Sequence, residues 1–232
     1  MYEKFLKRFL DFTLSLCGLI ALSPIFIVLI ILGIIFMRGN PFFIQKRAGK
    51  NEKIFNLIKF RTMDNRKDKQ GNLLPDAVRL NKYGRILRKT SFDELPELFN
   101  ILKGDMSIIG PRPLLLEYLP YYTKKEKHRH DVRPGLTGLA QVNGRSFVSW
   151  KEIFEYDLEY VNNISLKKDI QIIFSTVNKV LRHKDIADVS ESFVGEDGKR
   201  HFIINGIEYV LHQPLNVERK ENGNKTSISG DM

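Results

Sequence analysis

Residues 12–37 read FTLSLCGLIALSPIFIVLIILGIIFM and contain no charged side chain. A helix that crosses a bilayer takes roughly 20 apolar residues, so this run is long enough to enter a membrane. Pro24 follows Ser23 near its middle, and proline inside a helix removes a backbone donor and clashes with the preceding turn. Each half is too short to cross alone. The run therefore predicts a membrane segment that breaks at Ser23-Pro24.

Positive charges flank this segment on both sides. They are Lys4, Lys7 and Arg8 before it, and Arg38, Lys46, Arg47, Lys50 and Lys53 after it. Because cytoplasmic flanks are enriched in Lys and Arg, both ends are expected on the cytoplasmic side. A helix that enters, bends and returns satisfies this expectation. A proline-kinked spanning helix is also tolerated in membranes, and the residues alone leave both topologies open.

Size and charge limit the possibilities for the rest of the chain. The chain has 232 residues, enough for one core domain besides the membrane segment. Its formal net charge of +10 suits an anionic partner, which the charge alone leaves open between nucleic acid, lipid headgroups and a phosphorylated substrate. The single cysteine, Cys17, excludes a disulfide within the chain. Only one long apolar run exists, which argues against a protein with several membrane spans.

The residues after the membrane segment predict an α+β domain. Residues 42–61 indicate two strands around a turn at 49–52, and 64–76 a charged loop. Helices are expected at 80–89, 93–103, 150–161 and 166–183, the second with Leu95, Leu98, Phe99 and Leu102 as its buried stripe. Asn205-Gly206 is typical of a β-hairpin turn, and the tail from about Glu218 is expected to be disordered. The predicted divisions are an anchor at 1–38, a core domain at 39–186 and an extension at 187–232.

An acidic pair, Asp93 and Glu94, is the first candidate for chemistry. Ser91 with Glu94 matches a capping box, so a purely structural role is open. Starting the helix at Asp93 places Pro96 comfortably in the first turn. In either register the positive helix end is expected to keep Asp93 ionised, as a nucleophile or metal ligand requires. Because adjacent helical residues diverge by about 100°, one carboxylate could attack while the other holds a cation.

Arginines and a lysine form the second candidate group. Arg112 lies between two prolines whose fixed φ angles stiffen the backbone, and its guanidinium fork suits phosphate oxygens. An ordinary turn with a solvated arginine is the alternative. Lys59, Arg61, Arg88 and Arg145 also lie near the edges of motifs. His128, His130 and Asp131 are interpreted as a solvated face, because i,i+2 ligands separate on a helix. Neither a Walker loop nor a GxGxxG element is present.

The ordered motifs resemble the monotopic polyprenyl-phosphate phosphoglycosyl transferases, the bacterial sugar transferase family. The resemblance runs from Lys4 to about Lys184. It rests on Ser23-Pro24, Lys59-Phe60-Arg61-Thr62-Met63, Asp93-Glu94-Leu95-Pro96, Gly104-Asp105-Met106-Ser107, Gly110-Pro111-Arg112-Pro113, Arg133-Pro134-Gly135-Leu136-Thr137-Gly138 and Ala140-Gln141-Val142-Asn143-Gly144-Arg145. Each motif is weak alone, but their order is specific. Within the family, the sequence most resembles small members that act on UDP-N,N′-diacetylbacillosamine. Those end soon after the helix at 166–183, whereas this chain continues.

The resemblance implies a re-entrant helix–break–helix, with the catalytic domain on the cytoplasmic face of the bacterial inner membrane. It also implies transfer of a sugar 1-phosphate from a UDP-sugar to undecaprenyl phosphate, with release of UMP. Asp93 would be the nucleophile and Glu94, with Asp93, would hold Mg²⁺. The implied substrate-binding residues are Lys59, Arg61, Arg88, Arg112, Pro113, Arg145 and Asp157. The bilayer would be a partner, nucleic acid would not, and a homo-oligomer stays open.

A membrane-anchored basic protein that binds anionic lipid or nucleic acid is the alternative from another class. The anchor and the net charge would fit it. Asp93 and Glu94 would then cap a helix, and Arg112 would be a turn residue. The order of the motifs would have no explanation in that case, so the enzyme is the preferred hypothesis.

Overall fold

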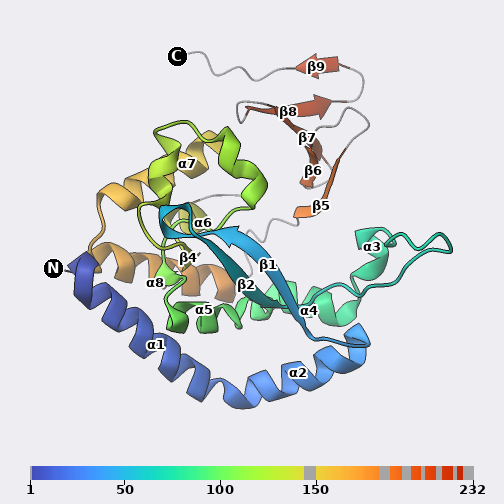
Figure 1. Ribbon diagram of the computed structural model, residues 1–232, viewed down its shortest axis with the longest axis horizontal. Helices are drawn as coiled ribbons and strands as arrows, with labels where there is room; N and C mark the ends of the chain where they lie inside the picture. The colour runs from blue at the N-terminus through green and yellow to red at the C-terminus, as the bar shows by residue number, and fades with distance from the viewer. Residues whose placement is uncertain are drawn as a thin grey trace.

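The computed structural model describes residues 2–143 and 150–182, together with five strands between 189 and 226. The chain opens with a π-helical turn, η1 (Tyr2–Leu6), followed by α1 (Lys7–Ala21) and α2 (Ser23–Met37). Figure 1 shows α1 and α2 as a bent pair along one edge of the fold, beside α5 and α4. Asp93 and Glu94 lie on the short segment between α4 and α5, the two helices that pack against this pair.

The chain bends by 65° between α1 and α2, at the Ser23-Pro24 step. Pro24 stands in the first turn of α2, where a missing N–H costs no intrahelical bond, and Ser23 Oγ donates to the Ile20 carbonyl at 2.8 Å. In the described part of the chain no single helix has the length and composition to cross a bilayer, and α1 with α2 passes only as a bent pair. The pair exposes large apolar side chains, among them Phe9 (64%), Ile20 (67%) and Ile35 (61%).

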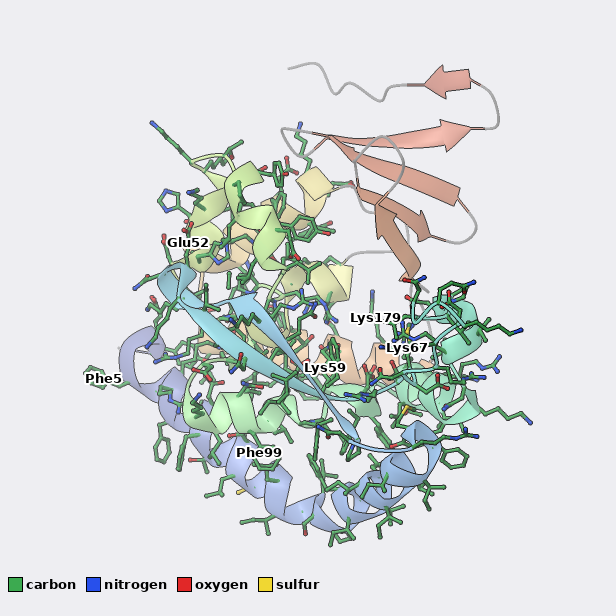
Figure 2. All side chains as sticks on the ribbon, turned by 45° about the vertical axis from the view of Figure 1, so that its right-hand side comes forward. Phe5, Glu52, Lys59, Lys67, Phe99 and Lys179 are labelled. Atoms are coloured by element: carbon green, nitrogen blue, oxygen red, sulfur yellow. The ribbon has the colours of Figure 1, made fainter. Side chains whose placement is uncertain are left out.

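The predicted hairpin is confirmed. β1 (Phe42–Ala48) and β2 (Ile54–Phe60) pair antiparallel along their whole length, joined through a 3₁₀ turn, η2 (Lys50–Glu52). The far end of β2 carries Lys59, whose side chain lies inside the fold, whereas Phe5 projects away from it (Figure 2). The hairpin therefore brings one member of the predicted cationic group towards the interior.

Two short helices and a 3₁₀ turn follow a charged loop: α3 (Asp76–Arg79), α4 (Lys82–Thr90) and η3 (Phe92–Glu94). Helix α5 (Glu97–Lys103) comes next and lies between β2 and α1. Its Asn100 side chain accepts from the Ile58 N–H at 3.0 Å and donates to the Asn56 carbonyl at 2.7 Å. These bonds fasten α5 to β2.

The buried stripe predicted for α5 is partly wrong. Glu97, Asn100 and Ile101 are its most buried side chains, whereas Leu95 and Leu98 are half-buried and Phe99 is 46% exposed. The face towards β2 is buried because polar groups there find partners. The apolar stripe instead faces the N-terminal helices, where Leu98 Cδ1 lies 3.6 Å from the position of a Cβ on Gly18.

A parallel pair that the sequence did not predict joins two Gly/Pro-rich loops. β3 (Ser107–Ile109) pairs with β4 (Gly135–Thr137), and the loops after β3 and before β4 touch backbone to backbone. A Cβ on Gly110 would lie 2.4 Å from the Arg133 carbonyl, and one on Gly135 would lie 2.1 Å from the Gly110 nitrogen. Glycine is required at both positions because any side chain would separate the loops.

Helical segments complete this domain. They are η4 (Leu116–Tyr121), η5 (Glu126–His130), α6 (Leu139–Asn143), α7 (Trp150–Asn162) and α8 (Leu166–Arg182). The predicted helices at 150–161 and 166–183 are confirmed to within a residue. Buried Asp169 of α8 accepts from Lys7 Nζ and from the Tyr160 hydroxyl, each at 2.7 Å. This ion pair ties α1 to the domain.

The C-terminal region forms an antiparallel sheet in chain order (Figure 1). Its strands are β5 (Val189–Val194), β6 (Arg200–Ile204), β7 (Ile207–His212), β8 (Asn216–Glu221) and β9 (Asn224–Thr226). The predicted hairpin arms appear as β6 and β7, and the turn at 205–206 lies outside the described residues. The expectation of a wholly disordered tail is wrong for β8 and β9. β8 pairs with β7 and β9 pairs with β8 through the backbone, which needs no apolar periodicity, so the sequence pattern did not reveal these strands.

Candidate active site

Asp93 and Glu94 lie on η3, between α4 and α5, and not on an α-helix. Ser91 ends α4 in the left-handed conformation (φ 57°), and its side chain makes no capping hydrogen bond. Pro96 precedes the first residue of α5. The predicted helix start at Asp93 and the capping box are therefore both wrong. The chain reverses at Ser91 and forms one 3₁₀ turn before α5 begins.

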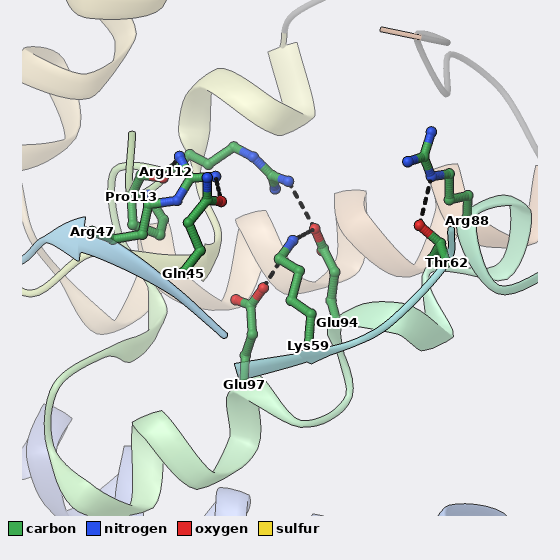
Figure 3. Close-up of polar contacts among 9 residues, drawn as sticks. All are labelled: Gln45, Arg47, Lys59, Thr62, Arg88, Glu94, Glu97, Arg112 and Pro113. Carbon is green, nitrogen blue, oxygen red and sulfur yellow. Dashed lines mark hydrogen bonds and ion pairs between the residues drawn. The ribbon is translucent and has the colours of Figure 1, made fainter. Parts of the chain in front are cut away.

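Glu94 receives two cations on one oxygen. Lys59 Nζ and Arg112 Nη2 each lie 2.7 Å from its Oε1 (Figure 3). Burial alone would raise the pKa of this carboxyl, but the charges of Arg112 and Lys59 outweigh it and lower the pKa to about 2. Glu94 is therefore ionised, and it gathers the two cations beside Asp93.

Asp93 has the opposite shift. Burial first, and then the negative charge of Glu94, raises its pKa to about 6, against the opposing charges of Lys59, Arg112 and Arg88. We expected a helix end to hold this carboxylate in its ionised form, and that reason is wrong because no α-helix begins there. The carboxylate is still mainly ionised at neutral pH, and it is more basic than an ordinary aspartate.

Arg112 is positioned through the backbone on both sides. The Pro113 carbonyl accepts from Arg47 Nη1 at 3.2 Å, and the carbonyl of Arg112 itself accepts from Arg129 Nη2 at 2.8 Å. Its side chain remains 47% exposed while its guanidinium reaches Glu94. The backbone around Arg112 is therefore held by hydrogen bonds from Arg47 and Arg129 as well as by the two flanking prolines.

Asp157 is buried and lies behind Arg112. Its Oδ2 accepts from Arg129 Nε at 3.0 Å and from Nη2 at 2.7 Å, and both side chains are 2% exposed. Asp157 therefore reaches the Arg112 loop through Arg129. The solvated face predicted for His128, His130 and Asp131 holds for His128, whose side chain is 65% exposed. It is wrong for His130, which is buried and packs against Tyr122.

Of the other predicted residues, Arg88 lies close to the acidic pair and Arg61 directly follows β2. Arg88 Nε donates to Thr62 Oγ1 at 3.1 Å, and its charge acts on the pKa of Asp93. Arg61 is half-buried, and its backbone N–H donates to the Pro41 carbonyl at 2.7 Å. Arg145 lies outside the described residues. The structure thus brings together Asp93, Glu94, Lys59, Arg112 and Arg88.

Sequence reasoning missed Glu97 and Arg129. Glu97 is 3% exposed, and its Oε1 lies 3.1 Å from Lys59 Nζ. Burial raises the pKa of its carboxyl to about 7. Glu97 contacts Lys59 and Arg129 contacts Asp157. Because both partners are distant in sequence, spacing along the chain gave no signal for Glu97 or Arg129.

The acidic pair fits a divalent cation only together with a substrate. No group of three or more His, Cys, Asp or Glu side chains that could hold a metal occurs in the part of the chain described here. Mg²⁺ keeps several waters and commonly binds through one or two carboxylates plus substrate phosphates. Asp93 and Glu94 are two carboxylates that could serve in this way. Burial first, and then the negative charge of Glu94, raises the pKa of Asp93, and a cation would relieve the repulsion between the two carboxylates.

The fold and the site together define a small α+β protein in which an acidic pair lies among cations next to a bent apolar helix pair. A family model, Bacterial sugar transferase, matches residues 2–183. The chain therefore belongs to the bacterial sugar transferase family and is an enzyme. Family membership supports the enzyme hypothesis over the basic binding protein.

Curated relatives agree with this membership. "Uncharacterized sugar transferase EpsL" of Bacillus subtilis is 48% identical over 196 residues, which cover 82% of this chain and 96% of that protein. "Undecaprenyl-phosphate galactose phosphotransferase" of Salmonella typhimurium is 37% identical over 198 residues, or 78% of this chain. "UDP-glucose:undecaprenyl-phosphate glucose-1-phosphate transferase" of Xanthomonas campestris is 37% identical over 190 residues, or 77% of this chain.

The chain spans 41% of the Salmonella protein and 39% of the Xanthomonas protein, so the activities in those names belong to longer chains. Neither name mentions N,N′-diacetylbacillosamine. The narrower resemblance to transferases of that sugar therefore stays a prediction.

Proposed function

We propose that this enzyme transfers a sugar 1-phosphate from a UDP-sugar to undecaprenyl phosphate and releases UMP. An Asp93 oxygen forms a bond to the sugar-bearing phosphorus, and the bond from that phosphorus to UMP breaks, with its electron pair leaving on UMP. An oxygen of undecaprenyl phosphate then attacks the same phosphorus, and the bond to Asp93 breaks. The carboxylate is regenerated, and the lipid carries the sugar diphosphate. The names of the Salmonella and Xanthomonas relatives support these substrates.

The environment of Asp93 is the observation that carries this proposal. A pKa of about 6 leaves the carboxylate ionised at neutral pH and more basic than usual, which favours nucleophilic attack. Lys59, Arg112 and Arg88 oppose that shift with positive charge, so an anionic diphosphate can approach an anionic nucleophile. A carboxylate that served only to end a helix would need no such surroundings.

Glu94, together with Asp93, would hold Mg²⁺, as the resemblance to the family implies. An Mg²⁺ ion bound there would supply positive charge beside the diphosphate of the donor. The chain itself contributes Arg112, whose half-exposed guanidinium can reach phosphate oxygens with a bidentate fork.

The bent helix pair would enter the membrane from the cytoplasmic side and return to it. Exposed apolar side chains on both helices and the 65° bend support this part of the proposal. The catalytic domain then lies at the membrane surface, where a soluble nucleotide-sugar and a lipid phosphate can reach one carboxylate in turn. The reaction would be the first membrane step in assembly of a glycoconjugate.

The decisive experiment uses the full chain in lipid nanodiscs with Mg²⁺, undecaprenyl phosphate and a panel of UDP-sugars. The wild type is expected to release UMP with at least one donor and, without acceptor, to carry a phosphosugar adduct on Asp93 detectable by mass spectrometry. Asp93→Ala should do neither. Asp131→Ala, at a surface carboxylate with 59% of its side chain exposed, is the matched control and should behave as wild type. Turnover in Asp93→Ala would refute the nucleophile.

The same panel addresses the donor sugar. UDP-N,N′-diacetylbacillosamine and UDP-N-acetylhexosamines should be included with UDP-galactose and UDP-glucose. UMP release with one donor and not with the others would assign the sugar, because differences of a few contacts give measurable discrimination between donors.

A further inference from the structure

Lys59 and Arg112 share one oxygen of Glu94, but they are held in different ways. Both cations lie 2.7 Å from Glu94 Oε1. Lys59 has a second carboxylate, Glu97, at 3.1 Å, and its side chain is 17% exposed. Arg112 is 47% exposed, and its guanidinium pairs with Glu94. Figure 3 shows Glu97 reaching Lys59 from α5, on the other side from Arg112.

This difference matters when the site is engaged by a phosphorylated donor. A cation bound with the donor would compete for Glu94, and the phosphate oxygens of the donor would compete for Lys59 and Arg112. Either change weakens the ion pairs that Glu94 makes with these two residues. Lys59 keeps a second carboxyl partner in Glu97, whose side chain is 4% exposed. When Glu97 is ionised, moving the Lys59 ammonium away would leave that buried charge alone. Among the described residues Arg112 has no second ion pair of this kind, so it can turn to the phosphates at little cost.

We propose that Glu97 is a positioning residue that keeps the Lys59 ammonium beside the acidic pair during donor binding, so that Arg112 is the cation released to the phosphates. This inference rests on the proposed function and deepens it. Glu97 itself is buried beneath Lys59 and is not placed to touch the donor.

A double-mutant cycle tests the pairing. Its variants are Glu97→Gln, which keeps the shape and removes the charge, Lys59→Met, and the two together. A matched control is Glu159→Gln, at a carboxylate that is 53% exposed and pairs with Lys168 on the surface. Thermal unfolding midpoints in detergent, which need no substrate, should show that the double variant loses clearly less than the sum of the single losses. Additive losses would overturn the pairing.

Donor kinetics test the consequence. A hydrogen bond to a charged group contributes enough that Glu97→Gln should lower kcat for UMP release by about ten- to a hundredfold, with little change in KM. In the Lys59→Met background, Glu97→Gln should reduce the residual UMP release by less than about twofold. If that background has lost turnover, UDP affinity is measured instead, and the same limit applies. Glu97→Asp should recover part of the loss because it restores the charge.

The outcomes separate the two proposals. A wild type that releases UMP while Glu97→Gln matches Glu159→Gln overturns the role of Glu97 alone. An equal loss from Glu97→Gln in both backgrounds also overturns it, because Glu97 would then act without Lys59. If the wild type releases no UMP from any donor, the proposed function fails, and the unfolding cycle still decides whether Glu97 holds Lys59.

Discussion

Replacing Asp157 with asparagine removes one half of a buried ion pair and leaves the other half charged. Arg129 and Asp157 are each 2% exposed and share hydrogen bonds of 2.7 and 3.0 Å. Breaking such a pair by removing one partner costs about 3–5 kcal/mol, because the remaining charge is buried without compensation. In a protein of this size each kcal/mol lowers the unfolding midpoint by roughly 2–4 °C, so Asp157→Asn should lower it by roughly 6–20 °C.

The assay is thermal unfolding in detergent, read alongside UMP release below the lowest midpoint. Glu159→Gln is again the control, since surface ion pairs contribute only about 0–1 kcal/mol. The double variant Arg129→Met/Asp157→Leu should recover much of the stability, because no buried charge is left unpaired. The UMP release of this double variant should be lower than that of the wild type, since the hydrogen bond from Arg129 to the Arg112 carbonyl is gone.

This experiment also decides how Asp157 contributes to the reaction. A carboxylate that binds substrate directly, as the sequence resemblance implied, would lose donor affinity on mutation with little change in the unfolding midpoint. An Asp157→Asn protein whose midpoint falls no further than that of Glu159→Gln would refute the reasoning from the buried pair.

Two further predictions concern pH and topology. The rate of adduct formation should rise as the pH passes through about 6, because a protonated Asp93 is not a nucleophile; a midpoint near the ordinary value of about 4, measured by quenched mass spectrometry, would contradict the raised pKa. In a Cys17→Ser background, single cysteines placed at Lys4 and at Arg38 should both react with an impermeant maleimide from the cytoplasmic side of sealed vesicles, and labelling from opposite sides would show a spanning helix instead.

Local chemistry made the first third of the fold predictable. Ser23-Pro24 indicated the position of the bend, because proline is tolerated in the first turn of a helix but not in its interior. The turn at 49–52 fixed the register of β1 and β2 in the same way. Both features depend on neighbours within a few residues, and sequence patterns describe such neighbours well.

The acidic pair shows where local rules fail. Ser91 and Glu94 have the spacing of a capping box, yet Ser91 adopts a left-handed conformation because it ends α4. The packing of α5 between β2 and α1 then made the face with Asn100 more buried than the predicted apolar stripe, since Asn100 bonds to the backbone of β2. Glu97 and Arg129 were missed for a related reason. Their partners, Lys59 and Asp157, are 38 and 28 residues away, so only the folded chain brings them together.

The structure also explains why the bent helix pair and the turn that carries the acidic pair belong to one folded unit. Arg8 of α1 donates to the carbonyls of Ile101 and Leu102 at 2.6 and 2.8 Å, near the C-terminal end of α5, where backbone carbonyls run out of partners within the helix. Asp11 of the same helix accepts from the Ile108 N–H at 2.9 Å, at the strand that leads into the Arg112 loop. One helix of the bent pair thus supports both segments that carry the site. A displacement of α1 would therefore act on α5 and β3 together, which favours a constant spacing between the acidic pair and Arg112.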